Sequence, residues 1–420
     1  MKTTDRIKFY THLLSNGHYL HTHKMDSALT EVHIVTQLGN IHSNNQIQFM
    51  NTGWVHFLEH ICFERSKKHP NKNFYKNKIQ QSGAYQNAAV YDYFTDFYLI
   101  SPTSTFFDAI PHFIDHIAYP VFSQKDIELQ KSIIKNEKAQ QKYFPGIDEL
   151  TLYLRTKWMF IAPASKEQVF GTKDSLELIT PKKLSLVHKN YFTKPVHIYI
   201  GGKFDLKKTI SLFELLPPIN KQNKQKVTNE FIPSWVNKAF HKFKTNDVEL
   251  PVLFFGSFNQ SWTIEELWGV SFILELLCDS DTGILQKWIR HDNGWSYGVD
   301  ITLEFSNLCL AWQLKISLNN EKNGKEIREK IHSKIFASIK NEKIISLSKN
   351  AQQLQKSFSF ETLSERMDYA VIINNSLGKI PNEQQHSEWL NSVTSKSLIP
   401  IYDKFFSKEN VGEFLAVPKK

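Results

Sequence analysis

Two histidines and one glutamate near the beginning of the chain have a spacing that suits metal chemistry. They occur in the segment His56-Phe57-Leu58-Glu59-His60, which reads H-x-x-E-H. On a helix, a spacing of four residues places both imidazoles on one face, one turn apart, so both can bind one small cation. Glu59 shares that face and can take a proton from a water molecule bound to the metal. These are the groups that a hydrolytic zinc site needs.

A catalytic zinc ion usually takes three protein ligands, and Glu137 is one candidate for the third. Residues 123–143 are expected to form one long helix that begins with Ser123 and Asp126 in a capping-box arrangement. Glu137 lies in the later half of this helix, 77 residues after His60. From composition alone, a solvated helical acid is the alternative interpretation.

Taken together, these residues resemble the pitrilysin-type, or M16, zinc metallopeptidases, whose relatives include insulin-degrading enzyme and the mitochondrial processing peptidase. That family of inverzincins carries H-x-x-E-H with a glutamate ligand about this far downstream. The resemblance implies that His56, His60 and Glu137 bind one Zn²⁺ per chain, and that Glu59 is catalytic. It also implies the M16/LuxS-like metallohydrolase architecture.

Two further segments carry the same resemblance. The segment from Gly83 to Ile100 resembles the family's substrate strand, which implies that Asn87 and Ala88 bind an extended peptide. Arg290 and Tyr297 resemble the arginine and tyrosine that the family's second half sends to the active site, where they would stabilise an oxyanion. Without the family, a surface arginine and a core tyrosine are the alternative.

The chain departs from the family pattern at two positions. Many members have a glutamate seven residues before the ligand glutamate, where this chain has Gln130. A threonine is common three residues after the asparagine of the substrate strand, where this chain has Val90. Neither position binds the metal, so the departures bear on catalytic rate and substrate preference.

Composition favours a cytoplasmic protein without a nucleic-acid partner. The only cysteines are Cys62, Cys278 and Cys309, with no C-x-x-C among them, so we expect a reducing compartment and no disulfide framework. The N-terminal segment lacks the continuous apolar core of a signal peptide, so we expect none, and no run approaches the ~20 apolar residues that a membrane span needs. The net charge is +9, but the lysines are scattered among acids, which is typical of an ordinary basic surface.

An internal repeat predicts two equivalent halves. Residues 179–194 (ITPKKLSLVHKNYFTK) and 393–408 (VTSKSLIPIYDKFFSK) align at a constant offset of 214. Each segment is expected to form a helix that ends in an aromatic doublet and leads into a strand. Two halves that end in the same unit indicate duplication.

The domain organisation follows from this repeat. We predict a zinc-binding domain at residues 1–218, a polar linker at 219–245 and a second homologous domain at 246–420. Strand patterns mixed with longer helical patterns favour an α+β class, with an antiparallel-rich sheet covered by helices in each half.

Other histidines are weaker metal candidates. His18, His21 and His23 are expected to lie in a turn, without an acidic or cysteine partner at useful spacing. His112 and His116 also have the i,i+4 spacing, but aromatic and aliphatic neighbours favour a packed amphipathic helix.

The sequence therefore predicts a zinc-dependent endopeptidase or oligopeptidase that acts on extended peptides or peptide precursors. Short members of the family pair with a second chain, which implies a homodimer or a heterodimer with a related subunit. The alternative is a non-catalytic scaffold subunit of the same fold that binds peptide and pairs with a catalytic partner.

Overall fold

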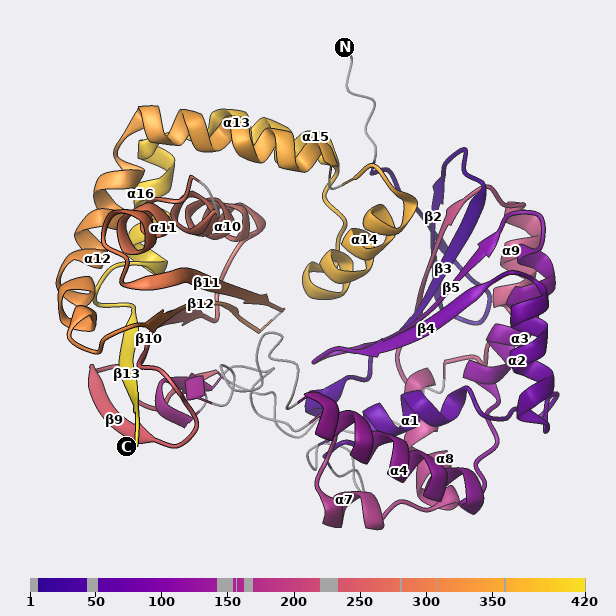
Figure 1. The fold of residues 1–420 in the computed structure, drawn as a ribbon. Helices are drawn as coiled ribbons and strands as arrows, with labels where there is room; N and C mark the ends of the chain where they lie inside the picture. The colour runs from indigo at the N-terminus through magenta and orange to yellow at the C-terminus, as the bar shows by residue number, and fades with distance from the viewer. Residues whose placement is uncertain are drawn as a thin grey trace.

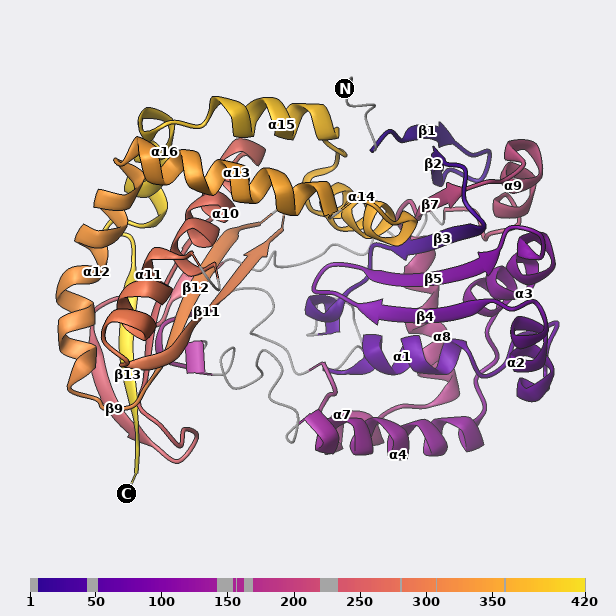
Figure 2. The same ribbon diagram turned by 45° about the horizontal axis from the view of Figure 1, so that its top comes forward.

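The computed structural model describes residues 7–43, 52–141, 154–155, 157–161, 169–219, 233–279, 282–306, 308–358 and 360–419. These residues form one large β-sheet in each half of the molecule, and helices pack against both sheets (Figure 1, Figure 2). This arrangement confirms the predicted α+β class with two helix-covered sheets. Among the described helices, none combines the length and apolar composition that a membrane span requires.

The first sheet has six strands in the order β1-β2-β7-β3-β5-β4. The strands are β1 (Tyr10–Leu13), β2 (Tyr19–Lys24), β3 (Leu29–Thr36), β4 (Tyr85–Val90), β5 (Thr95–Pro102) and β7 (His197–Gly202). The helices of this half are η1 (Asn40–Ser43), α1 (Trp54–Cys62), α2 (Lys72–Gln81), α3 (Phe106–Ala118), α4 (Gln124–Gln141), α7 (Lys173–Glu177), α8 (Pro181–His188), η2 (Lys189–Phe192) and α9 (Leu206–Phe213).

The second sheet has five strands in the order β11-β12-β10-β13-β9. The strands are β9 (His241–Thr245), β10 (Val252–Asn259), β11 (Ser296–Phe305), β12 (Leu310–Leu318) and β13 (Gly412–Pro418), and a separate short pair joins β6 (Phe160–Ile161) to β8 (Ser234–Trp235). The helices are α10 (Ile264–Cys278), α11 (Ile284–Gln286), the π-helical segment η3 (Lys287–Asp292), α12 (Asn323–Ile339), α13 (Glu342–Phe358), α14 (Leu363–Leu377), α15 (Glu383–Ser392) and α16 (Ser395–Phe405).

The two sheets have the same topology. Strands β2, β7, β3, β5 and β4 correspond in spatial order to β9, β13, β10, β12 and β11. The directions also agree, because β2–β7 and β9–β13 are the parallel pairs and the other neighbours are antiparallel. The repeated segments form α8 before β7 and α16 before β13, so the topology supports the predicted duplication.

Helix α14 crosses from the second half of the sequence to the first sheet. It packs on β3 and β7, and its apolar face joins a buried cluster that includes Val35, Tyr199, Met367, Ala370 and Val371. Figure 1 shows α14 between the two halves. The first sheet is therefore covered on one face by its own helices and on the other by this helix. Cover on both faces explains why β3 is buried along nearly its whole length.

Two sequence expectations differ from the structure. The histidines of GHYLHTH do not form a turn, because His21 and His23 lie in strand β2, where both side chains are buried. The range predicted as a linker contains β8 and β9 after residue 233, so this part belongs to sheets, while residues 220–232 lie outside the described residues. The sequence of β9, HKFKT, alternates partly buried and exposed side chains, and its two exposed lysines made the segment resemble a polar linker.

Candidate metal centre

Helix α1 places the H-x-x-E-H residues in the interior of the first half. Gly53 precedes the helix with φ 82°, and a side chain there would collide with the backbone of Gly171. Trp54 donates a hydrogen bond from Nε1 to the carbonyl of Ser175 at 2.8 Å. The helix is therefore fixed at its beginning, and the Phe170 ring packs edge-on against His56.

The nitrogen atoms of the two histidines meet on one face of α1. His56 Nε2 and His60 Nε2 lie 3.2 Å apart, and Glu59 Oε2 lies 3.9 Å and 3.7 Å from them. The possible metal-ligand atoms of these three side chains all lie within 4.8 Å of one another. The predicted spacing thus brings these side chains together.

Helix α4 adds Glu137 to this group. The helix begins as predicted, because the amide of Asp126 donates to Ser123 Oγ at 3.1 Å and the Ser123 hydroxyl donates back to the Asp126 carboxylate. Helices α1 and α4 pack together. Glu137 Oε2 reaches 3.4 Å from His60 Nε2 and 3.9 Å from His56 Nε2.

These distances fit a zinc ion. Tetrahedral bonds of about 2.0–2.1 Å place neighbouring ligand atoms about 3.3 Å apart. The separations of 3.2, 3.4 and 3.9 Å between His56, His60 and Glu137 are close to that value. Two imidazoles and one carboxylate are also a ligand set that zinc accepts, with a fourth position left open.

Burial and neighbouring charges set the protonation of the ligands. Burial, together with the neighbouring His60, lowers the pKa of His56 to about 4, although Glu137 opposes the shift. His56 is therefore neutral at pH 7, as a metal ligand must be. Burial opposes charge on His60 as well, but its interactions with Glu137 and Glu59 outweigh this effect and raise its pKa. The hydrogen bond with His60 lowers the pKa of Glu137.

Glu59 differs from Glu137 in its surroundings. The residue is 8% exposed, and burial raises its pKa to about 7, with His60 opposing the shift and Glu137 adding to it. A carboxylate with a pKa near neutrality can both accept and return a proton during a reaction.

The predicted peptide-binding residues lie on an exposed sheet edge next to α1. Strand β4 is the edge of the first sheet and packs against α1. Asn87 Oδ1 accepts a hydrogen bond from the amide of Ala88 at 2.9 Å, and Asn87 Nδ2 donates to the hydroxyl of Tyr85 at 3.2 Å. An edge strand can pair with an extended peptide through its backbone.

Arg290 and Tyr297 lie together but in the other half. The Arg290 guanidinium stacks 4.5 Å from the centroid of the Tyr297 ring, and Tyr297 is 84% exposed. Arg290 is in η3 and Tyr297 in β11. Helix α11, which leads into η3, and helix α1 lie in opposite halves in both views (Figure 1, Figure 2). Within one chain, the pair is not brought to the H-x-x-E-H residues.

The remaining histidine candidates have structural partners. His18 Nε2 bonds to the carbonyl of Pro217, and His21 Nε2 bonds to His197 Nδ1 at 3.0 Å. His116 is buried in α3, and His112 Nδ1 lies 2.8 Å from His69 Nε2. The helical packing expected for His112 and His116 is therefore confirmed. Cys62, Cys278 and Cys309 are buried and form no disulfide.

Two buried residues lie near the site, of which Gln130 was noted from the sequence only as a departure from the family pattern and Glu64 was not identified. Glu64 follows α1 and is 5% exposed, and Gln130 on α4 is 4% exposed. Gln130 Nε2 donates to Glu64 Oε1 at 3.1 Å. The i,i+4 spacing from His60 to Glu64 is the one sequence signal that could have indicated this contact.

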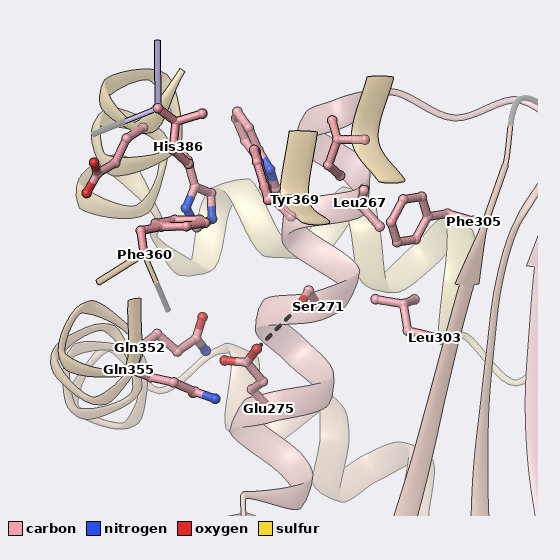
Figure 3. Close-up of a pocket in the computed structure, with 14 residues that line it drawn as sticks. Leu267, Ser271, Glu275, Leu303, Phe305, Gln352, Gln355, Phe360, Tyr369 and His386 are labelled. Atoms are coloured by element: carbon pink, nitrogen blue, oxygen red, sulfur yellow. Dashed lines mark hydrogen bonds between the residues drawn. The ribbon is translucent and has the colours of Figure 1, made fainter. Parts of the chain in front are cut away.

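A pocket of about 260 Å³ lies in the second half, apart from the H-x-x-E-H residues (Figure 3). It is bounded by α10, α13, α14, α15 and the end of β11, and its lining is mostly apolar, with Glu275 bonded to Ser271 in its wall. None of the predicted site residues lines it.

Comparisons with known proteins show which sequences and folds the chain resembles. Residues 21–163 match the sequence profile of the family described as Insulinase (Peptidase family M16), a segment that includes α1 and α4. Protease 3 of Salmonella typhi is 31% identical over 95 residues, which is 23% of this chain and 10% of that protein. The matched segment is thus a small part of that curated relative.

Solved structures resemble the whole chain. A protease from Helicobacter pylori aligns with a TM-score of 0.80 at 14% identity, covering 98% of this chain and 100% of that one. A peptidase M16 inactive domain from Pseudomonas fluorescens aligns with a TM-score of 0.79 at 13% identity, covering 99% and 98%. Together these findings support a peptidase M16 fold for the chain.

Proposed function

We propose, on the premise of a peptidase M16 fold, that this chain is a zinc-dependent endopeptidase or oligopeptidase that cleaves extended peptides. One observation carries the proposal. His56 Nε2, His60 Nε2 and Glu137 Oε2 converge with separations that suit one zinc ion, beside the buried carboxylate of Glu59. Zinc bound there would polarise the scissile carbonyl and make water a better nucleophile.

Residues of the chain itself would bind the substrate and transfer protons during the reaction. Strand β4 would hold the substrate backbone along its edge, with Asn87 and Ala88 in contact with the peptide. Glu59 would take a proton from the attacking water and pass it to the leaving amine, a role that suits its position 3.7 Å from His60 Nε2. Backbone recognition of this kind depends little on substrate side chains.

Zinc content and cleavage of two variants test this function. We expect about one zinc per chain in the wild type and in Glu59→Gln, and little in His60→Ala. Cleavage of an extended fluorogenic peptide should fall about 10²–10⁴-fold in Glu59→Gln, because the proton acceptor is lost while the metal stays. Wild-type cleavage by Glu59→Gln would exclude this role for Glu59.

A non-catalytic scaffold of the same fold is the second candidate, because one structural neighbour is an inactive M16 domain. Such a subunit would bind peptide without zinc and without cleavage. A wild-type protein that holds no zinc after loading, yet binds the peptide, would favour it.

We further propose that the active unit contains two chains. Arg290 and Tyr297 lie in the half opposite to α1, so they would complete the site of a partner chain rather than their own. The partner would be a second copy or a related subunit.

Mixing two inactive variants tests whether the partner is a second copy of the chain. Glu59→Gln chains and Arg290→Ala chains should each be inactive as homodimers. In a homodimer with shared sites, random mixing restores one site in half of the dimers, so about a quarter of wild-type activity should return. A mixture of wild-type chains with Glu59→Gln/Arg290→Ala chains is the control for the dilution of active chains. A mixture without recovery, from a wild type that is active alone, would exclude shared sites between identical chains.

A further inference from the structure

The pocket of the second half has an acidic lining in a basic protein. The chain contains 51 lysine and arginine residues. None of them is among the 14 described residues that line the pocket, which include Glu275 and Glu383. The volume of about 260 Å³ exceeds the roughly 150 Å³ of an apolar cavity that admits benzene. The pocket therefore has room for a small molecule with an aromatic ring and a short polar arm.

Polar and apolar side chains lie at opposite ends of this pocket. Figure 3 shows Glu275 and Gln352 at the lower end of the view. Leu267, Phe305 and Tyr369 lie at the upper end of the same view. Ligand pockets commonly combine apolar walls with a few polar groups that fix the orientation of the ligand. A ligand with one polar and one apolar end would match this arrangement.

Glu275 is a half-buried carboxylate on α10. Its Oε1 accepts a hydrogen bond from the Ser271 hydroxyl at 3.4 Å, and among the described residues no lysine or arginine pairs with it. Burial raises the pKa of Glu275 to about 7, against the hydrogen bond from Ser271, and the neighbouring Asp279 adds to the shift. A cation in the pocket would counter this effect, because an opposite charge favours the ionised carboxylate.

Gln352 on α13 adds a second acceptor at the same end. Its Nε2 donates to the carbonyl of Phe272 at 3.3 Å and to Ser348 Oγ at 3.0 Å. A backbone carbonyl only accepts, so this contact fixes the amide and leaves the side-chain carbonyl of Gln352 as an acceptor. An ammonium group donates three hydrogen bonds and accepts none, so it suits a carboxylate beside an amide carbonyl.

The aromatic lining of the pocket favours the same charge. It includes Trp268, Phe305, Phe360 and Tyr369, and the rings of Phe360 and Tyr369 meet edge to face with their centroids 5.2 Å apart. Aromatic faces attract cations, and the same rings provide apolar contact area. Charge and packing thus both favour an amphipathic cation.

We propose that this pocket binds a small organic amine, with the ammonium group beside Glu275 and Gln352 and the apolar body at the opposite end. The inference does not depend on the proposed peptidase function, because the pocket contains none of the H-x-x-E-H residues. Tyr369 belongs to α14, so the ligand would contact the helix that covers the first sheet. Binding to the folded protein alone would also stabilise it.

Tryptamine and tryptophol test this proposal, because they share an indole ring and differ in one polar group. At pH 8, Glu275 is mostly ionised, tryptamine carries an ammonium and tryptophol carries a neutral hydroxyl. We expect calorimetry to give a Kd below about 1 mM for tryptamine and at least about tenfold weaker binding for tryptophol. Tryptamine should also raise the unfolding temperature. Absence of tryptamine binding, or equal affinity for the two compounds, would overturn the proposal.

Three variants test where the amine binds. Glu275→Gln should lower the affinity for tryptamine about tenfold and leave that for tryptophol within about threefold. Glu265→Gln removes the same charge from an exposed position on α10, so this control should retain the difference between the ligands. Leu303→Trp should exclude both compounds by filling the pocket, and thermal unfolding shows whether this variant folds. Wild-type affinity for tryptamine in Glu275→Gln, or in folded Leu303→Trp, would contradict the assigned site.

Discussion

Glu59 and Glu137 are two carboxylates of one site whose protonation differs because their surroundings differ. Glu59 is buried and its pKa is raised to about 7, whereas the hydrogen bond with His60 lowers the pKa of Glu137. Paired groups whose pKa values are driven apart in this way are typical of a base and a ligand in one active site. The side chain that remains charged suits a cation, and the one near neutrality suits proton transfer.

Replacement of Glu137 tests its role as a ligand. Glu137→Ala should lower zinc affinity by at least about 100-fold, more than the loss of an outer partner typically costs. The metal-free protein should unfold at nearly the wild-type temperature, because the Glu137 side chain is 37% exposed. Chelator competition and thermal unfolding measure both quantities, with Glu128→Ala on the same helix as control. Undiminished zinc affinity would remove Glu137 from the ligand set.

The predictability of the site from sequence depends on distance along the chain. His56, Glu59 and His60 could be grouped because helical spacing alone brings them together. Glu137 could not be derived physically, because its approach to His60 depends on how α1 and α4 pack, and it entered through family resemblance. The contact between Glu64 and Gln130 was missed for the same reason.

At the scale of elements, the two halves share the same strand order, but only the first half contains the H-x-x-E-H residues. Helix α10 follows β10 in the second half as α1 follows β3 in the first. Its sequence, IEELWGVSFILELLC, contains no histidine and is mostly buried. One half thus carries the candidate metal centre, while the equivalent helix of the other half serves packing.

The edge strand β4 yields a prediction about substrate binding. Asn87→Ala should raise KM about 3–10-fold, the effect of one hydrogen bond, and leave kcat within about twofold. The reason is that Asn87 would bind the peptide backbone equally well before and during the reaction. Steady-state kinetics on an extended peptide measure both constants, with Gln80→Ala on α2 as control. A fall in kcat at constant KM would contradict this role.

Strand prediction succeeded after the two repeated segments, where β7 and β13 follow α8 and α16. It failed at β9, which lies within the predicted linker, and at β2, where GHYLHTH was taken for a turn. His21 and His23 are buried in β2, where both ring nitrogens of His21 are hydrogen-bonded, to Thr11 and His197, and His23 Nδ1 lies 3.0 Å from the carbonyl of Lys8. Hydropathy gives no sign of such pairing, since the partners come from distant segments.

At the scale of the whole molecule, α14 joins the two halves. Its apolar face packs on the first sheet, although the helix lies far inside the range predicted as the second domain. A polar network accompanies this contact. His33 Nδ1 bonds to Asp96 Oδ2 at 2.8 Å, His33 Nε2 bonds to Glu31 Oε1 at 3.1 Å, and the Ser364 hydroxyl of α14 donates to Glu31 Oε2 at 2.6 Å. Asp368 of α14 also faces His33.

This network predicts a pH-dependent stability. Burial disfavours charge on His33, but Asp96 and Glu31 outweigh it and raise the pKa from 6.5 to about 10. The stabilisation is therefore complete below about pH 6.5 and is lost as the pH rises through 10. His33→Gln should cost about 3–5 kcal/mol of unfolding free energy at pH 6, because two buried carboxylates lose their cation, and much less above pH 10. Urea unfolding at both pH values measures the difference. His188→Gln is the control, since burial lowers the pKa of His188 to about 4, so its cost should change by less than about 1 kcal/mol over this range. An equal cost of His33→Gln at both pH values would show that His33 is neutral in the folded protein.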